Sequence, residues 1–308
     1  MPPMMRAMSQ PSNTAPAQIF DRVLHARRRA RAAEGFAAHD FLIRRVTDEI
    51  DGRLAAINRT FPLALDLGCH RGALAQAGLP PGKIGAIVSA DLSPAMLEHA
   101  PGLRVAADEE ALPFAPASFN LVTSMLSLHW VNDLPGALIQ IRRALAPDGL
   151  FIGAIFGGET LIELREALGE AEIEHEGGLS PRVSPFADLR DMGGLLQRAG
   201  FALPVADTDR VTVRYANPLK LMAELRGMGE TNALRERRRT PLKRTTLMRA
   251  AEIYQRKFGL PDGRIPATFE IVTATGWAPH ESQQKPLAPG SARMRLADAL
   301  ARREPSSG

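Results

Sequence analysis

Three aspartates each follow a short apolar segment in the first half of the chain, and two glycines follow the first of them. Asp66 is separated from Asp91 by 25 residues, and Asp108 comes after the third segment. Gly68 and Gly72 let a ligand approach the backbone closely, and such a turn directs amide donors toward it. A strand-end aspartate alone is more often a turn former or a helix cap. The ordered series with its glycines favours a ligand site.

The position of the first acid decides between nucleotide-like ligands. A dinucleotide site needs a G-x-G-x-x-G turn for a pyrophosphate, whereas Asp66 places a carboxylate beside a cationic or amine-bearing ligand. S-adenosylmethionine carries an ammonium and a sulfonium and fits this requirement. Asp91 is placed to accept hydrogen bonds from both ribose hydroxyls, and Asp108 to accept one from the adenine amino group. Leu92 would form an apolar wall against the adenine ring.

The elements that must position these residues are predicted from hydrophobic patterns. Apolar runs without alternation are typical of parallel strands covered on both faces. They occupy residues 63–67, 84–90, 103–107, 119–126 and 150–156. The segment from Leu134 to Leu145 is an amphipathic helix that a Pro-Asp-Gly turn at 147–149 should end.

The remaining segments complete the prediction of a seven-stranded, doubly wound, mostly parallel α/β sheet, a Rossmann-like fold. Residues 19–59 should form N-terminal helices. The domain should span 60–278, with its last two strands at 209–215 and 267–275 and a helical insertion at about 216–266. Further helices are expected at 160–174, 186–199, 218–227 and 245–258, and disordered tails at 1–18 and 279–308.

Composition limits the class of protein. The chain has 308 residues, 45% of them hydrophobic and 23% charged, as in a globular protein. Its one cysteine, Cys69, excludes an internal disulfide framework, so a reducing compartment is expected. The longest uncharged stretch, 111–132, contains prolines, Asn120 and His129 and is not expected to span a membrane. Phe, Tyr and Trp together number 16, and no stacking motif indicates nucleic-acid binding.

The net charge of +4 arises largely from two arginine-rich stretches. Seven arginines lie between Asp21 and Arg45 against three acids, and eight basic residues lie between Arg235 and Arg256 against two acids. Such runs mark solvated helix faces or a surface that binds an acidic partner.

Four motifs resemble the ordered motifs of class I S-adenosylmethionine-dependent methyltransferases. They are LDLGCHRG at 65–72, ADLSPAML at 90–97, the segment 108–138 beginning DEEALPF, and LAPDGLF at 145–151. They look most like the family of complex I assembly factors that act as arginine hydroxylases, with malonyl-carrier-protein methyltransferases as neighbours. IFDRVLHARRRARA at 19–32 and the segment 177–201 favour the assembly-factor family.

The resemblance implies further residues of the cofactor site: Cys69, Glu109, Ser124 and His129. For His129 and the adjacent Trp130, packing under the sheet is an equally good interpretation. His70 departs from the family pattern, because a glycine usually stands there; we expect its ring to face solvent, and the alternative is a direct contact to the methionine carboxylate of the cofactor. No catalytic residue and no metal ligand set is identified.

Three functions remain open. The first is an S-adenosylmethionine-dependent enzyme that modifies a protein or a protein-carried substrate, in the cytoplasm or, in a eukaryote, the mitochondrial matrix. The second is hydroxylation of an arginine in a complex I subunit on the same fold, as the resemblance implies. The third is a noncatalytic assembly module that binds an acidic partner through its arginine-rich helices. The sequence leaves the oligomeric state undetermined.

Overall fold

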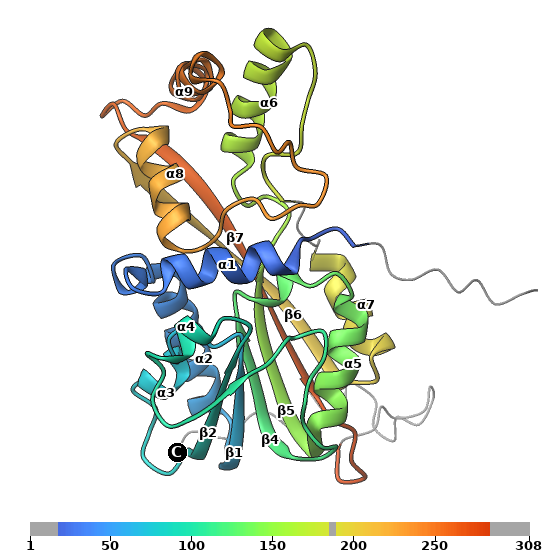
Figure 1. Cartoon of the computed structure of the whole chain (residues 1–308). Coiled ribbons are helices and arrows are strands. Elements are labelled where there is room, and N and C mark those ends of the chain that lie inside the picture. The colour runs from blue at the N-terminus through green and yellow to red at the C-terminus, as the bar shows by residue number, and fades with distance from the viewer. Residues whose placement is uncertain (1–17, 185–188, 284–308) are drawn as a thin grey trace, which may run out of the picture.

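The computed structural model describes residues 18–184 and 189–283, and these contain the expected seven-stranded sheet (Figure 1). Its strand order is β3-β2-β1-β4-β5-β7-β6. The first five strands pair in parallel, and β7 is antiparallel to both β5 and β6. The strands are β1 (Phe61–Leu67), β2 (Ile84–Asp91), β3 (Leu103–Ala106), β4 (Phe119–Met125), β5 (Leu145–Phe156), β6 (Ala202–Tyr215) and β7 (Ile265–Trp277).

The central strands are apolar on successive residues because helices cover both faces of the sheet. Leu121 and Val122 of β4 are both wholly buried but belong to separate apolar cores. The helices are α1 (Arg22–Ala32), α2 (Phe41–Ala56), α3 (Ala73–Gln76), α4 (Pro94–Leu97), α5 (Leu134–Ala144), α6 (Ile162–Glu176), α7 (Leu189–Arg198), α8 (Pro218–Gly227) and α9 (Arg244–Phe258), with 3-10 turns at Phe36–Ala38 and Leu128–Trp130.

The core that contains Leu121 includes residues of α2, α6, α8 and α9, whereas the core that contains Val122 includes residues of α5 and α7. The two helices α8 and α9 lie between β6 and β7 in sequence, as expected for the insertion. None of the helices in the described ranges is both long and apolar enough to cross a bilayer.

Strands β1 and β7 begin slightly earlier than predicted, at Phe61 and Ile265, and strands β5 and β6 begin much earlier, at Leu145 and Ala202. The Pro-Asp-Gly segment at 147–149, expected to be a turn before the strand, lies inside β5, where the pairing with β4 shifts register between Phe119 and Leu121. Asp148 lies in this irregular segment and has a left-handed backbone, with a φ of 62°. Strand β6 begins at Ala202 rather than 209. Its first half was not predicted because β6 is an edge strand in which partly buried and exposed residues alternate, so it contains no continuous apolar run.

The predicted tails fall mostly outside the described residues, as does the start of the helix expected from residue 186. The element that most affects the site is α1. It crosses the carboxyl edge of the sheet, between the strand ends and the layer of α6, α8 and α9 (Figure 1).

Candidate functional site at the carboxyl edge of the sheet

The strand order brings the three predicted aspartates to one edge. Asp66 is the last residue but one of β1 and lies beside Ser89 of β2, and Asp91 ends β2 beside Ala106 of β3, two residues before Asp108. These strands are adjacent and parallel, so their carboxyl ends meet. The carboxylates therefore border one region, as expected.

Asp66 lies wholly buried at the end of β1. Its Oδ1 accepts a hydrogen bond of 3.2 Å from Thr123 Oγ1 on β4, and the backbone amide of Leu74 also interacts with the carboxyl group, while Oδ2 forms no close hydrogen bond with the residues that the structure describes. Burial raises the pKa of Asp66 to about 7. A buried carboxylate oxygen without a donor is costly unless the group is protonated or a ligand supplies the donor.

The turn after β1 has left-handed backbone at three alternate positions, Gly68, His70 and Gly72, with φ of 67°, 54° and 77°. A Cβ on Gly68 would overlap the Ser127 side chain, so this position requires glycine. Cys69, between Gly68 and His70 in the turn, is wholly buried, and burial raises the pKa of its thiol. It contributes a small side chain to the floor of the turn.

The expectation that the His70 ring faces solvent is wrong. The residue is 2% exposed, its Nε2 lies 2.9 Å from the carbonyl oxygen of Met125, and its ring stacks on Phe36 at 5.2 Å between centroids. The left-handed backbone directs the side chain inward, where an acceptor and an aromatic face are available. Burial and the nearby Arg29 hold the pKa of His70 well below its ordinary value, so the ring is neutral.

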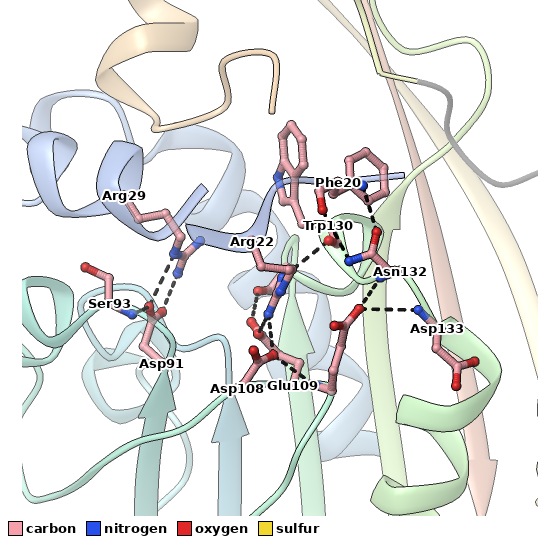
Figure 2. A network of polar contacts seen from close by, with 12 residues as sticks. Phe20, Arg22, Arg29, Asp91, Ser93, Asp108, Glu109, Trp130, Asn132 and Asp133 are labelled. Carbon is pink, nitrogen blue, oxygen red and sulfur yellow. Dashed lines mark hydrogen bonds and ion pairs between the residues drawn. The ribbon is translucent and has the colours of Figure 1, made fainter. Parts of the chain in front are cut away.

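Asp91, the predicted ribose acceptor, is bound by α1. Arg29 Nε lies 3.2 Å from Asp91 Oδ1, and Arg29 Nη2 forms an ion pair with Oδ2 (Figure 2). The backbone amides of His70 and Ser93 donate to the same carboxylate at 2.9 and 2.8 Å. Both Arg29 and Asp91 are buried, so the structure contains a buried ion pair at the centre of the predicted cofactor site.

A second arginine of α1 binds the next acids along the edge. Arg22 donates to Asp108 Oδ1 at 2.7 Å and also pairs with Glu109 (Figure 2). The other Glu109 oxygen accepts from Ser127 Oγ at 2.6 Å. Arg22 also reaches the carbonyl oxygen of Trp130 at 3.3 Å.

The His129 and Trp130 side chains lie close to this edge and converge on Glu230, in the loop after α8. Trp130 Nε1 donates to Glu230 Oε2 at 2.7 Å, and His129 Nε2 lies 3.2 Å from the same oxygen. Trp130 also stacks on His25 of α1 at 4.7 Å between centroids. The pair therefore packs under α1 and binds a carboxylate of the insertion.

The other predicted site residues have less specific environments. Ser124 near the end of β4 is wholly buried, and its hydroxyl has no partner within the described part of the chain. Leu92 is partly buried directly after Asp91.

Sequence reasoning missed Arg22, Arg29, Ser127 and Glu230. For the two arginines, neither interpretation of the basic stretch is correct, because they bind acids of their own chain. A signal was available in their spacing: seven residues correspond to two helical turns, which places both side chains on one face of α1. Nothing in the sequence marked that face as the one directed at the sheet.

A hollow of about 700 Å³ lies beside the edge, under α6 and α8. Its apolar lining includes Phe156, Leu164 and Leu225, and Glu230 and Trp130 border it on the side of α1. Several arginines also line it, namely Arg28, Arg182, Arg226, Arg237, Arg238 and Arg239. The hollow thus combines an apolar wall with an excess of positive charge.

The residues present fit S-adenosylmethionine. Asp66 offers a buried oxygen that forms no hydrogen bond with the described residues and could accept one from an ammonium, and the left-handed turn at Gly68 and Gly72 is the glycine turn expected beside the methionyl end. Asp91 and Asp108 are placed for a ribose and an adenine, although arginines of α1 bind both carboxylates in this structure.

Comparisons with known proteins agree with this geometry. A methyltransferase domain family model matches residues 65–153. The arginine-hydroxylase NDUFAF5, mitochondrial, of Danio rerio is 44% identical over 91% of this chain and 89% of its own length. The malonyl-[acyl-carrier protein] O-methyltransferase of Halorhodospira halophila is 37% identical over 92% of this chain and 96% of its own.

Among solved structures, a phosphoethanolamine N-methyltransferase 2 of Haemonchus contortus in complex with S-adenosyl-L-methionine has the same fold. The TM-score is 0.51 at 16% sequence identity, and the match covers 80% of this chain and 57% of that one. Identity this low concerns the fold alone. The predicted Rossmann-like methyltransferase fold is confirmed.

Proposed function

Because the chain belongs to the family that contains the NDUFAF5 arginine hydroxylases and the malonyl-[acyl-carrier protein] O-methyltransferases, we propose that it is an S-adenosylmethionine-dependent enzyme. Its substrate is a protein or a group carried by a protein, and its role is linked to assembly of respiratory complex I. It works in the cytoplasm, or in the mitochondrial matrix if the chain is eukaryotic.

The observation that carries this proposal is the row of carboxylates at the ends of β1, β2 and β3, next to a glycine turn. In the proposed complex Asp66 binds the ammonium, Gly68 and Gly72 hold the methionyl end, Asp91 binds the ribose and Asp108 binds the adenine. Transfer of a methyl group requires mainly that the acceptor be aligned with the sulfonium in a dry pocket. Alignment alone can supply ~7–11 kcal/mol of the barrier, so the site needs no dedicated base.

The first test is calorimetry with S-adenosylmethionine and with its demethylated product. We expect Asp91→Ala to weaken binding at least tenfold, about 1.4 kcal/mol, because the ribose loses its acceptor. Asp209→Ala is the matched control, since Asp209 pairs with Arg45 at the surface, far from the edge. Equal affinity in both variants would reject the ribose assignment, and no binding by the wild type would favour the noncatalytic assembly module.

A second candidate, hydroxylation of an arginine, is favoured by one observation of the site. The carboxylates of the edge bind two guanidinium groups, those of Arg22 and Arg29, so the edge is chemically suited to an arginine side chain. The NDUFAF5 relatives are arginine hydroxylases by name and are 44–47% identical over about 90% of the chain in Danio rerio and human.

Mass spectrometry separates the two reactions. Complex I subunits from a wild-type and a deletion strain are compared at every arginine and at methylated positions. A gain of one oxygen at an arginine that disappears in the deletion strain supports hydroxylation, and loss of a methyl group supports methyl transfer.

A further inference from the structure

Helix α1 is held across the cofactor edge by two cationic side chains that point into it. Arg22 and Arg29 lie two turns apart on the sheet-facing side of the helix, and their guanidinium groups meet Asp108, Glu109 and Asp91 (Figure 2). Arg27 of the same helix is exposed instead. The docking of α1 therefore depends on the same carboxylates that are proposed to hold the cofactor.

The Asp91 carboxylate cannot bind the Arg29 guanidinium and the ribose of the cofactor at the same time. Arg29 engages both of its oxygens, and the amides of His70 and Ser93 take one further contact on each. A ribose diol would need the lone pairs that Arg29 occupies. Arg29 is 1% exposed and Asp91 is wholly buried, so a sugar could reach this carboxylate only after Arg29 has moved away.

We propose that α1 is a strap that closes the cofactor site and that S-adenosylmethionine displaces. On this proposal, which rests on the proposed function, Asp91 exchanges Arg29 for the ribose, and Asp108 exchanges Arg22 for the adenine. The ribose hydroxyls and the adenine amino group would donate hydrogen bonds in place of the two guanidinium groups, so Asp91 and Asp108 keep donors in both states.

Other contacts of α1 would carry this displacement to the insertion. The amide of Asp21 donates to the carbonyl oxygen of Ala233 at 2.8 Å, Phe20 forms a bridge with Leu234, and Arg28 donates to the carbonyl oxygen of Asn232. When α1 leaves the edge, the loop after α8 loses these partners. That loop contains Glu230 and lines the arginine-rich hollow, so cofactor binding would open the hollow.

Trp130 provides a direct signal of strap release. It is 2% exposed, and it stacks on His25 and meets Phe20 edge-on at 5.3 Å. The chain has two tryptophans, so Trp277→Phe leaves Trp130 as the sole tryptophan, and excitation at the red edge of the absorption band selects it over the two tyrosines. In that background, titration with S-adenosylmethionine should shift the emission of Trp130 to longer wavelength, because α1 no longer covers the ring.

Hydrogen exchange tests the same movement without a substitution. We expect the amides of residues 22–32 to exchange at least tenfold faster in the wild type saturated with S-adenosylmethionine than in the free protein. Arg29→Met removes the guanidinium but keeps much of the apolar stem, and it should bind the cofactor at least tenfold more tightly in calorimetry. Arg27→Met is the matched control and should bind as the wild type does.

Slower or unchanged exchange of α1 in a protein that binds the cofactor would overturn the strap and leave the proposed function intact. Equal affinity of Arg29→Met and wild type would also overturn it. If Arg29→Met does not fold, Arg22→Met, at a site 11% exposed, gives the affinity comparison. No binding by the wild type and both arginine variants would overturn the proposed function, and the strap with it.

Discussion

The most informative single residue is Asp66, because its carboxyl is buried and one of its oxygens forms no hydrogen bond within the described ranges 18–184 and 189–283. Its pKa of about 7 lies above the ordinary value, so the folded protein favours the neutral form. Its contribution to stability is fully present below the ordinary pKa near 4 and is lost as the pH rises toward 7.

Asp66→Asn should therefore change how stability depends on pH. Relative to this variant, the wild type should lose roughly 1.4 kcal/mol of unfolding free energy per pH unit between about 4 and 7, and the difference should level off above 7. Urea denaturation of both proteins across this range measures it. Parallel pH profiles would show that Asp66 titrates normally.

At the level of residues, the sequence predicted the acids of the site better than their partners. The positions of Asp66, Asp91 and Asp108 followed from strand ends that meet in any parallel sheet. The ring of His70 was misplaced because its direction depends on a left-handed backbone that the residue type does not announce. Arg22 and Arg29 were missed because a charge run has the same pattern whether it faces water or the chain's own acids.

Among the elements, helix α6 fixes the segment that follows it through one buried acid. Glu172 is wholly buried and accepts from the backbone and hydroxyl of Ser180 at 2.8 and 2.7 Å, and from Arg182 Nε at 2.7 Å. These donors, together with the cation, outweigh burial and hold the pKa of Glu172 below its ordinary value.

Glu172→Ala should destabilise the protein by about 1–3 kcal/mol, because Ser180 and Arg182 lose their acceptor in a mostly buried setting. Glu170→Ala is the control on the same helix: Glu170 pairs with Arg256 and Lys257 at the surface, where solvent screens the ion pairs, so this loss should be clearly smaller than that of Glu172→Ala. Denaturant unfolding of the two variants measures the loss of unfolding free energy in each. Equal losses would contradict the role given to Glu172.

The accuracy of the element predictions follows the burial of each strand. The central strands were placed nearly to their ends because they are apolar on both faces. The start of β5 was missed because Pro147 and Gly149 read as a stop, and the start of β6 because an edge strand carries polar residues such as Asp207. The insertion after β6 was predicted only from the order of the strands.

For the whole molecule, the most important division is between the central sheet and the elements that cover its carboxyl edge, namely α1 and the insertion. The methyltransferase domain model covers residues 65–153, which include β2 to β4, the end of β1 from Leu65 and most of β5. The remaining chain supplies α1 and the insertion, which meet in a small apolar cluster of Phe20, Trp130, Ala233 and Leu234. The family expected from the motifs is confirmed, whereas no sequence motif predicted the contacts between α1 and the insertion.

The position of the sole thiol turns this protein into its own unfolding reporter. Cys69 lies wholly buried in the turn after β1, and burial raises its pKa, so the folded chain should resist alkylation. Modification by a maleimide should proceed only through opening of the turn, and saturating S-adenosylmethionine should slow it. Rapid labelling of the folded protein, timed by mass spectrometry, would contradict this. Labelling of this natural cysteine therefore reports when the turn after β1 opens, with no engineered residue.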